Sequence, residues 1–328
     1  MSEWYSFNDQ MNEIFGGKVL RLSLSAGCTC PNRDGSLSSG GCIFCSEGGS
    51  GDFAFSGELS AQIEAAKRSA LSKIGKNTDF AGYMAYFQPF TNTYGDTDSL
   101  AELFEQAAAY PEVVSLCIAT RPDCISDEMI CRLAAVNKKT PVFVELGLQT
   151  VHEDTAAYIN RCYETRVFED TFLRLKSAGL RTAAHVIIGL PGEDARRTKE
   201  TVKYLSSLKY VCASSSGRNA NPFLDGIKLQ LLYVLKNTPL AHLLPELPFV
   251  RRYDAAKYPQ EYLILNDGMY LPLYSLYEYA DLIKELIEEL PGKCAVYRAT
   301  GDAPGKDLIL PKWAADKKRV LNAIRAQF

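Results

Sequence analysis

The sequence contains few histidines, no long apolar runs and little net charge. Its 328 residues include three histidines, so imidazole can contribute little to a metal site. No apolar run spans a membrane, and the first residues, Met-Ser-Glu-Trp-Tyr, lack the apolar core of a signal peptide. We therefore expect a cytoplasmic protein with no membrane partner. The formal net charge of −3 gives no overall basic field, so we expect no DNA partner, although a local basic patch remains open.

Cysteine, in contrast, is abundant. Ten cysteines in a chain without a secretion signal favour a reducing compartment over a disulfide scaffold. The hydrophobic content of 47% is enough for one large core, and neither a Pro/Ser-rich linker nor an internal repeat divides the chain.

Three of the cysteines lie in a polar loop suited to a metal centre. Cys42 and Cys45 have two residues between them, and Cys30 precedes Cys42 across a run rich in Asn, Asp, Gly and Ser. A structural zinc ion or a closed iron–sulfur cluster takes four ligands, so three thiolates leave one metal position open. No histidine lies near the loop to complete a zinc site. A surface loop with incidental cysteines, or a zinc site that borrows a distant ligand, remains an alternative.

The rest of the chain alternates strand-like and helix-like segments. Strands are expected at 19–26, 82–88, 113–119, 141–147, 181–188 and 227–234. Helices are expected at 58–74, 98–109, 126–137, 151–159, 166–178, 194–208 and 276–290. Six successive βα units predict an α/β protein with a parallel sheet, open or curled, whose site lies at the carboxyl ends of the strands.

The cysteine loop resembles the cluster loop of radical S-adenosylmethionine (radical SAM) enzymes, with a longer first gap. Phe44 stands before the last cysteine, where that superfamily usually has an aromatic residue. The resemblance implies that Cys30, Cys42 and Cys45 bind a [4Fe–4S] cluster whose fourth iron binds SAM. Cys28 departs from the pattern. It could be a fourth thiolate, a reactive thiol or, as we favour, a small buried hydrophobe.

Polar residues at the strand ends extend this resemblance to SAM binding. Gln88, Thr91 and Asn92 lie where the superfamily has a small-residue motif, although its two glycines are missing here. Thr120 lies in a Thr-Arg-Pro-Asp sequence like that of the Elongator catalytic subunit, but Ala119 replaces the glutamate that precedes it there. Arg121 and Asp123 of this sequence could instead pair structurally.

Two further strand ends carry residues of the same kind. Gln149 and Arg161 resemble a pair that reaches SAM, with the guanidinium on its carboxylate. Leu190 belongs to Gly-Leu-Pro-Gly-Glu, which lies beside the adenine in radical SAM proteins. His185 is either a cavity residue or a core residue, and Glu145 is expected to face the barrel interior.

These motifs together resemble the standalone YhcC/YtqA-type family, which is related to the radical SAM domain of the Elongator catalytic subunit. The resemblance implies a partial (βα)6 barrel over 19–240, with a short N-terminal arm over 1–18. A C-terminal helical and loop extension over 241–328 would close the barrel. Within it, the residues expected at the mouth are Arg298, Asp302, Lys312 and Trp313.

The implied activity is reductive cleavage of SAM to a 5′-deoxyadenosyl radical that takes hydrogen from a substrate. An electron donor such as ferredoxin or flavodoxin would be needed. Kinship with Elongator suggests a tRNA wobble uridine as substrate, with its flipped-out base held at the mouth. The residues suggested for that contact are Tyr274, Tyr277, Arg251, Arg252, Lys312 and Trp313. A small-molecule substrate, or a non-catalytic iron–sulfur sensor or electron carrier, is the alternative.

Overall fold

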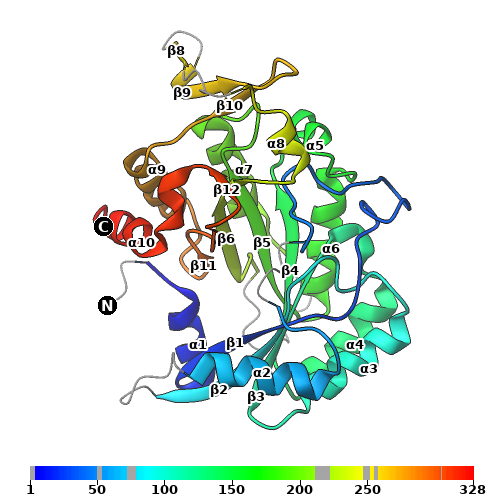
Figure 1. Ribbon diagram of the computed structural model, residues 1–328. Coiled ribbons are helices and arrows are strands. Elements are labelled where there is room, and N and C mark those ends of the chain that lie inside the picture. Colours follow the sequence, from blue (N-terminus) through cyan, green and yellow to red (C-terminus); the bar gives the residue numbers. More distant parts are fainter. Residues whose placement is uncertain are drawn as a thin grey trace.

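A curled parallel sheet forms the centre of the computed structural model, which describes residues 4–49, 54–71, 79–210, 222–246, 252–254, 258–303 and 305–328. Its seven strands follow the order β1-β2-β3-β4-β5-β6-β11, so the sheet makes a half-barrel (Figure 1). The strands are β1 (Lys18–Leu24), β2 (Phe80–Phe87), β3 (Val113–Thr120), β4 (Val142–Gln149), β5 (Arg181–Ile188), β6 (Gly226–Leu231) and β11 (Ala295–Arg298).

The six strands expected from the sequence are confirmed, and the seventh comes from the C-terminal region. Strand β11 pairs in parallel with β6, beginning with Ala295 opposite Gly226. It has four residues, which is too few for an alternating pattern to reveal. The last strand of the sheet therefore comes from residues 241–328, the segment that the sequence predicted to be a closing extension.

Most of the helices cover the outer face of the sheet, and the expected ones are confirmed within a few residues at each end. They are α1 (Phe7–Phe15), α2 (Leu59–Leu71), α3 (Thr97–Ala108), α4 (Asp127–Asn137), α5 (Glu153–Tyr158), α6 (Thr165–Ser177), α7 (Ala195–Ser207), α8 (Pro239–His242), α9 (Leu276–Glu288) and α10 (Lys317–Arg325). Ser126 caps α4 by accepting a hydrogen bond from the Met129 amide, as Ser at that position predicts.

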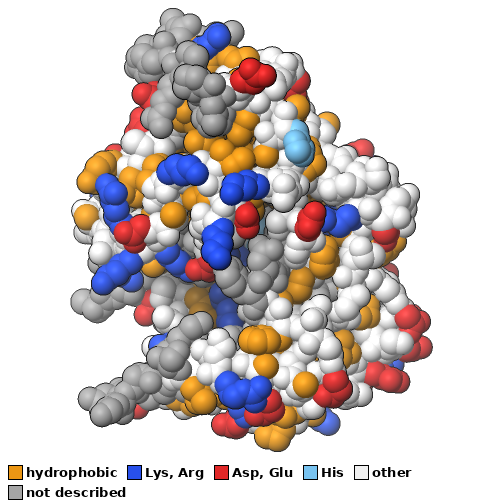
Figure 2. All heavy atoms as spheres, viewed as in Figure 1, with side chains coloured by type: hydrophobic (Ala, Val, Ile, Leu, Met, Phe, Trp, Pro, Cys, Tyr) orange, Lys and Arg blue, Asp and Glu red, His pale blue; other side chains and the backbone are white. Residues whose placement is uncertain are grey.

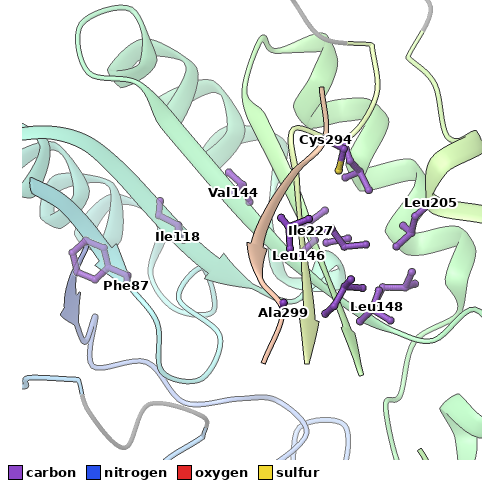
Figure 3. Close-up of a cluster of buried hydrophobic side chains, with 14 of the residues drawn as sticks. Phe87, Ile118, Val144, Leu146, Leu148, Leu205, Ile227, Cys294 and Ala299 are labelled. Carbon is purple, nitrogen blue, oxygen red and sulfur yellow. The ribbon is translucent and has the colours of Figure 1, made fainter. Parts of the chain in front are cut away.

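The main hydrophobic core lies between the sheet and these helices. Phe87, Ile118 and Val144 point from three neighbouring strands into it, with Leu205 of α7 and Ile227 of β6 further along (Figure 3). Because side chains alternate along a strand, these residues leave the next positions facing the inside of the half-barrel. The site is built from those inward positions.

Helix α1 lies across the inner side of the sheet and connects its two edges. It packs against both β1 and β11. Gln10 donates to the Asp225 carbonyl at 2.8 Å and accepts from the Tyr297 hydroxyl at 2.8 Å. The rings of Trp4 and of the last residue, Phe328, lie 5.1 Å apart. One short helix thus spans the gap between the first and last strands.

Smaller elements complete the C-terminal region. Strands β8 (Arg252–Asp254), β9 (Tyr258–Ile264) and β10 (Tyr270–Pro272) form an antiparallel sheet, and β7 (Val234–Leu235) pairs with β12 (Leu308–Leu310). The 3-10 turns are η1 (Pro122–Cys124) and η2 (Lys312–Ala315). No helix within the described ranges has the length and apolar character needed to cross a membrane. The polar segment 213–222, rich in Ser and Asn, lies outside the described residues except for Pro222.

Candidate active site

A cavity of about 610 Å³ occupies the inside of the half-barrel. Its walls come from the inward positions of the strands, from the cysteine loop and from residues near β11. Figure 2 shows a hollow near the middle of this face, with Lys and Arg side chains gathered around it. Of the twelve predicted site residues, ten line the cavity: Cys30, Cys42, Cys45, Phe44, Gln88, Thr91, Thr120, Gln149, Arg161 and His185.

The three predicted cluster cysteines face this cavity from one loop. The Cys45 amide donates to the Cys42 carbonyl at 3.0 Å, which forms a tight turn between them. The fully buried Asn32 side chain donates to Cys42 Sγ at 3.6 Å and to the Asn160 carbonyl. The neighbouring Cys45 thiol and burial raise the pKa of Cys42, while Arg121 acts in the opposite direction. The loop is therefore anchored to the barrel, with a cation beside its sulfurs.

These sulfurs suit a [4Fe–4S] cluster. Within the described parts of the chain, no three His, Cys, Asp or Glu side chains lie close enough together to hold one ion. A cluster gives each cysteine an iron of its own, and three cysteines leave the fourth iron open.

Polar side chains line the cavity beside the cysteine loop. The Gln88 amide oxygen accepts from Ser23 Oγ at 3.3 Å, and the backbone amide of Thr91 donates to the Thr29 carbonyl at 3.2 Å. Gln149 has the unusual φ of 64°, and its side-chain oxygen accepts from the Tyr163 hydroxyl at 3.1 Å. The ends of β1, β2 and β4 therefore present fixed polar groups next to the sulfurs.

Arg161 lines the cavity, but its guanidinium already donates hydrogen bonds to groups of the protein in every direction. Its Nε donates to the Tyr163 carbonyl, and Nη1 donates to the carbonyls of Leu148 and Thr150. Its Nη2 donates to Glu153 at 3.2 Å and to the Thr165 hydroxyl at 3.3 Å. A guanidinium has five N–H donors, and these contacts use all of them. The predicted contact with the SAM carboxylate stays a prediction, and it requires an exchange of one of these partners.

Arg121 pairs with Asp123, which is the structural alternative that the sequence offered. Its Nε and Nη2 donate to the two carboxylate oxygens at 3.0 and 2.7 Å. The Tyr163 ring lies between two guanidiniums, 4.9 Å from that of Arg121 and 4.7 Å from that of Arg161. Thr120, next to Arg121, shares a 2.5 Å hydrogen bond with the Thr93 hydroxyl.

Asn92 and Leu190 do not line the cavity. Asn92 is fully buried, and its amide donates to the carbonyls of Phe87 at 3.1 Å and Ala119 at 2.8 Å. It therefore ties the carboxyl ends of β2 and β3 together. Leu190 is fully buried in a separate hydrophobic cluster that includes Ile159 and Leu263.

A buried polar layer lies deeper in the cavity. We call Arg21, Tyr86, Glu145, His185, Lys228 and Arg298 the inner cluster. Oε2 of Glu145 accepts hydrogen bonds from Tyr86 at 2.8 Å, from His185 Nε2 at 3.0 Å and from Lys228 Nζ. Glu145 thus faces the interior, as expected, and His185 is a cavity residue rather than a core residue.

The charges of the inner cluster shift one another. Burial raises the pKa of Glu145, but Lys228 and His185 outweigh burial and hold it well below its usual range. Burial lowers the pKa of Lys228 to about 8, and Arg21 and Arg298 add to that decrease against the pull of Glu145. The pKa of His185 is lowered as well, by burial and then by Lys228.

The predicted mouth residues divide into two groups. Arg298 and Asp302 line the cavity and lie 3.6 Å apart. Lys312 instead donates to the Leu308 carbonyl, and Trp313 donates to the Tyr274 carbonyl. Neither they nor Tyr274, Tyr277 and Arg252 are part of the cavity lining. Arg251 lies outside the described residues.

Cys28 lies apart from the three predicted ligands. It packs against the main core and lines a separate shallow hollow with Thr29, Tyr94 and Cys124. Burial raises the pKa of its thiol to about 11. This environment suits the expected small hydrophobe.

Sequence reasoning missed Arg21, Tyr86, Tyr163 and Lys228 as cavity residues. Arg21 and Lys228 are single cations at alternate positions of apolar strands, in Val-Leu-Arg-Leu and Gly-Ile-Lys-Leu. A charged residue is rarely buried without a partner, so such a position signals an inward-facing site. Tyr163 follows Arg161 in a turn and carries no comparable signal.

Comparison with known proteins decides the family. Residues 30–205, more than half of the chain, match the Radical SAM superfamily, and residues 265–328 match the Radical_SAM C-terminal domain. The chain belongs to the radical SAM superfamily. Members use a [4Fe–4S] cluster and SAM, so this chain is an enzyme with those cofactors rather than a non-catalytic carrier. It also needs an electron donor, as radical SAM enzymes generally do.

Relatives of this radical SAM protein cover its whole length. YtqA of Bacillus subtilis is 36% identical over 99% of this chain and 89% of that protein. The tRNA uridine(34) acetyltransferase of Methanocaldococcus jannaschii is 31% identical over 33% of this chain and 20% of that protein. A solved structure of Elp3 from Methanocaldococcus infernus, with an N-terminal deletion, aligns with a TM-score of 0.59 and 15% identity. That alignment covers 94% of this chain and 63% of the Elp3 chain, and it supports the partial-barrel fold.

Proposed function

We propose that this radical SAM enzyme remodels the wobble uridine of a tRNA. The observation that carries the proposal is the sequence match to the tRNA uridine(34) acetyltransferase, which is named for an activity on that nucleotide. The match covers a third of the chain, and the overall fold is shared with archaeal Elp3. Together they favour a nucleotide substrate over a small metabolite.

The charge of the C-terminal segment supports an RNA partner. Residues 298–328 hold seven Lys or Arg and three Asp or Glu, whereas the whole chain carries a net charge of −3. Part of this charge lies on α10, where Lys317, Lys318 and Arg319 follow one another. Contacts to backbone phosphates supply much of the affinity of proteins for nucleic acids. A local basic segment beside the cavity therefore suits a tRNA better than the overall charge suggests.

The roles of the cavity residues follow from their places. We assign Cys30, Cys42 and Cys45 to the cluster, which together with SAM supplies one-electron cleavage and a radical able to take hydrogen from the substrate. Phe44, Gln88, Thr91, Thr120 and Gln149 would orient SAM beside the cluster. Asn92 and Leu190 would act indirectly, by fixing the strand ends.

Three further assignments belong to this proposal. Ferredoxin or flavodoxin would deliver the electron, and the enzyme would act in the cytoplasm, where its thiols stay reduced. The chain would divide into an arm over 1–18, a barrel over 19–240 and a closing extension over 241–328. Support for the last part comes from Arg298 and Asp302, which line the cavity.

The test measures SAM cleavage with and without tRNA. The protein is reconstituted anaerobically with iron and sulfide, reduced and given SAM, and 5′-deoxyadenosine is measured by mass spectrometry. Cys42→Ala serves as the control that cannot hold the cluster. We expect bulk tRNA to raise product formation in the wild type only. An unchanged rate with tRNA, together with a rise on addition of small-metabolite extract, would reject the RNA substrate.

A further inference from the structure

The cavity holds more positive than negative charge. Six Lys or Arg residues and two Asp or Glu residues line it: Arg21, Arg33, Arg121, Arg161, Lys228 and Arg298 against Glu145 and Asp302. Arg33, Arg121 and Arg161 lie near the cysteine loop or its anchors, where thiolates supply negative charge. The remaining three cations, Arg21, Lys228 and Arg298, belong to the inner cluster.

The two carboxylates do not neutralise this inner group. Glu145 directs Oε2 to Lys228, His185 and Tyr86. Asp302 lies 3.6 Å from Arg298 and is shared with Lys317. Among the described residues Arg21 makes no direct ion pair, although its charge helps to lower the pKa of Glu145.

Arg21 is also poorly satisfied as a hydrogen-bond donor. Its Nε and Nη2 atoms are buried and have no acceptor among the residues that the structure describes. The guanidinium stacks 3.7 Å from the centre of the Phe7 ring, a contact that uses its flat face and leaves its edge free. A buried guanidinium edge without an acceptor is costly, so its retention points to a ligand that supplies one.

Neighbouring groups respond to the same excess charge. Arg21 and Arg298 both help to lower the pKa of Lys228, and Arg298 contributes to the lowered pKa of His185. An anion within the inner cluster would offset all of these repulsions at once, because opposite charges attract strongly where water is excluded.

We propose that the inner cluster binds a negatively charged group, a carboxylate or a phosphate, with Arg21 as its principal partner. The substrate is the molecule that would bring this group, because the carboxyl group of SAM binds the open iron of the cluster in radical SAM enzymes. The proposal does not depend on tRNA as the substrate, because any molecule with this chemistry would occupy the site.

The first arm of the test observes His185 in the reconstituted protein with the cluster oxidised. The chain has three histidines, so the ring signal of His185 can be assigned by NMR from the spectrum of His185→Gln. The pKa of His185 is then compared in acetate, phosphate and chloride at equal ionic strength. We expect acetate or phosphate to raise this pKa in the wild type and not in Arg21→Gln. Arg166→Gln, which removes a charge that is 78% exposed on α6, should respond like the wild type.

The second arm tests whether the anion belongs to the substrate rather than to SAM. SAM affinity is measured by calorimetry in the wild type, Arg21→Gln and Arg21→Lys, with bound iron as the check on folding. An unchanged SAM affinity with a lost anion response is the expected result and assigns the site to the substrate. A loss of about tenfold in Arg21→Gln with recovery in Arg21→Lys would place the SAM carboxylate here and overturn that assignment.

The proposal is overturned if acetate and phosphate leave the pKa of His185 unchanged in the wild type, or if they raise it equally in Arg21→Gln. Neither arm uses tRNA. A failure of tRNA to raise SAM cleavage would therefore reject the proposed function while leaving the anion site standing.

Discussion

The Tyr86 hydroxyl donates a 2.8 Å hydrogen bond to Glu145, although the two residues lie 59 positions apart on β2 and β4. Lys228 on β6 donates to the same hydroxyl at 2.7 Å and also pairs with Glu145. Three strands are therefore connected across the inside of the half-barrel by one buried polar network. Such a network is stable only while its charges remain balanced.

We predict that Glu145→Gln destabilises the protein by about 3–5 kcal/mol, because it leaves the Lys228 ammonium buried without its carboxylate. The double variant Glu145→Gln with Lys228→Met removes both charges and should recover much of this loss. Urea unfolding of the wild type and the two variants measures the effect. Equal stabilities for Glu145→Gln and the double variant would contradict the prediction.

The lowered pKa of Lys228 predicts a specific pH dependence. The folded state releases this proton near pH 8, whereas an unfolded lysine keeps it up to about pH 10.4. Between these values the unfolded state binds more protons, so this group makes the free energy of unfolding rise with pH. The slope is at most about 1.4 kcal/mol per pH unit.

Other groups titrate in the same range, so the measurement must be a difference. The stability of the wild type minus that of Lys228→Met should increase from about pH 8 to pH 10. Urea unfolding at closely spaced pH values provides it. A constant difference would mean that Lys228 keeps an ordinary pKa in the folded protein.

The cysteine loop gives a matched pair of substitutions two positions apart. Cys30→Ser should bind much less iron after reconstitution, because Cys30 lines the cavity with the other predicted ligands. Cys28→Ser should keep the cluster, because its thiol packs at the edge of the core in a separate hollow. Iron and sulfide content per protein, together with the visible absorbance, measures both. Cluster loss in Cys28→Ser would make Cys28 a fourth ligand.

Arg161→Lys is expected to reduce stability more than it affects ligand binding. The substitution keeps the charge but cannot reproduce five N–H contacts, so the carbonyls of Leu148 and Thr150 lose donors. Unsatisfied buried acceptors of this kind cost about 1–3 kcal/mol each. Thermal unfolding measures the loss of stability, and SAM titration measures the loss of SAM affinity. A large loss of SAM affinity at unchanged stability would instead support the predicted contact between Arg161 and the SAM carboxylate.

The sequence predicted the fold well where segments were long and periodic. Most of the six predicted strands and their helices carry apolar patterns over about eight or more residues. The ends of these elements in the structure lie within a few positions of the predicted ends. The sequence did not predict strand β11, because four residues are too few to show an apolar pattern. Its pairing with β6 also joins segments about 70 residues apart. Long-range pairing of so short a strand follows from tertiary packing rather than from local preference.

The site was predictable where residue chemistry is distinctive and less so where partners decide the role. Three cysteines in a polar loop indicated a metal centre by themselves. Arg161 looked available for a carboxylate because a sequence does not display the carbonyls that turn toward its guanidinium. Arg21 went unnoticed for the opposite reason, since its importance lies in the partner that it lacks among the described residues.

The bridge made by α1 has a consequence for how the chain acquires its structure. Gln10 is made early in synthesis, but both of its partners, at Asp225 and Tyr297, emerge much later. Helix α1 can therefore reach its final position between the two edge strands only after most of the chain has been synthesised. Contacts between such distant residues slow folding. We expect the half-barrel to close last at this seam, and the exposed edges of β1 and β6 to be the surfaces that aggregate if synthesis stalls.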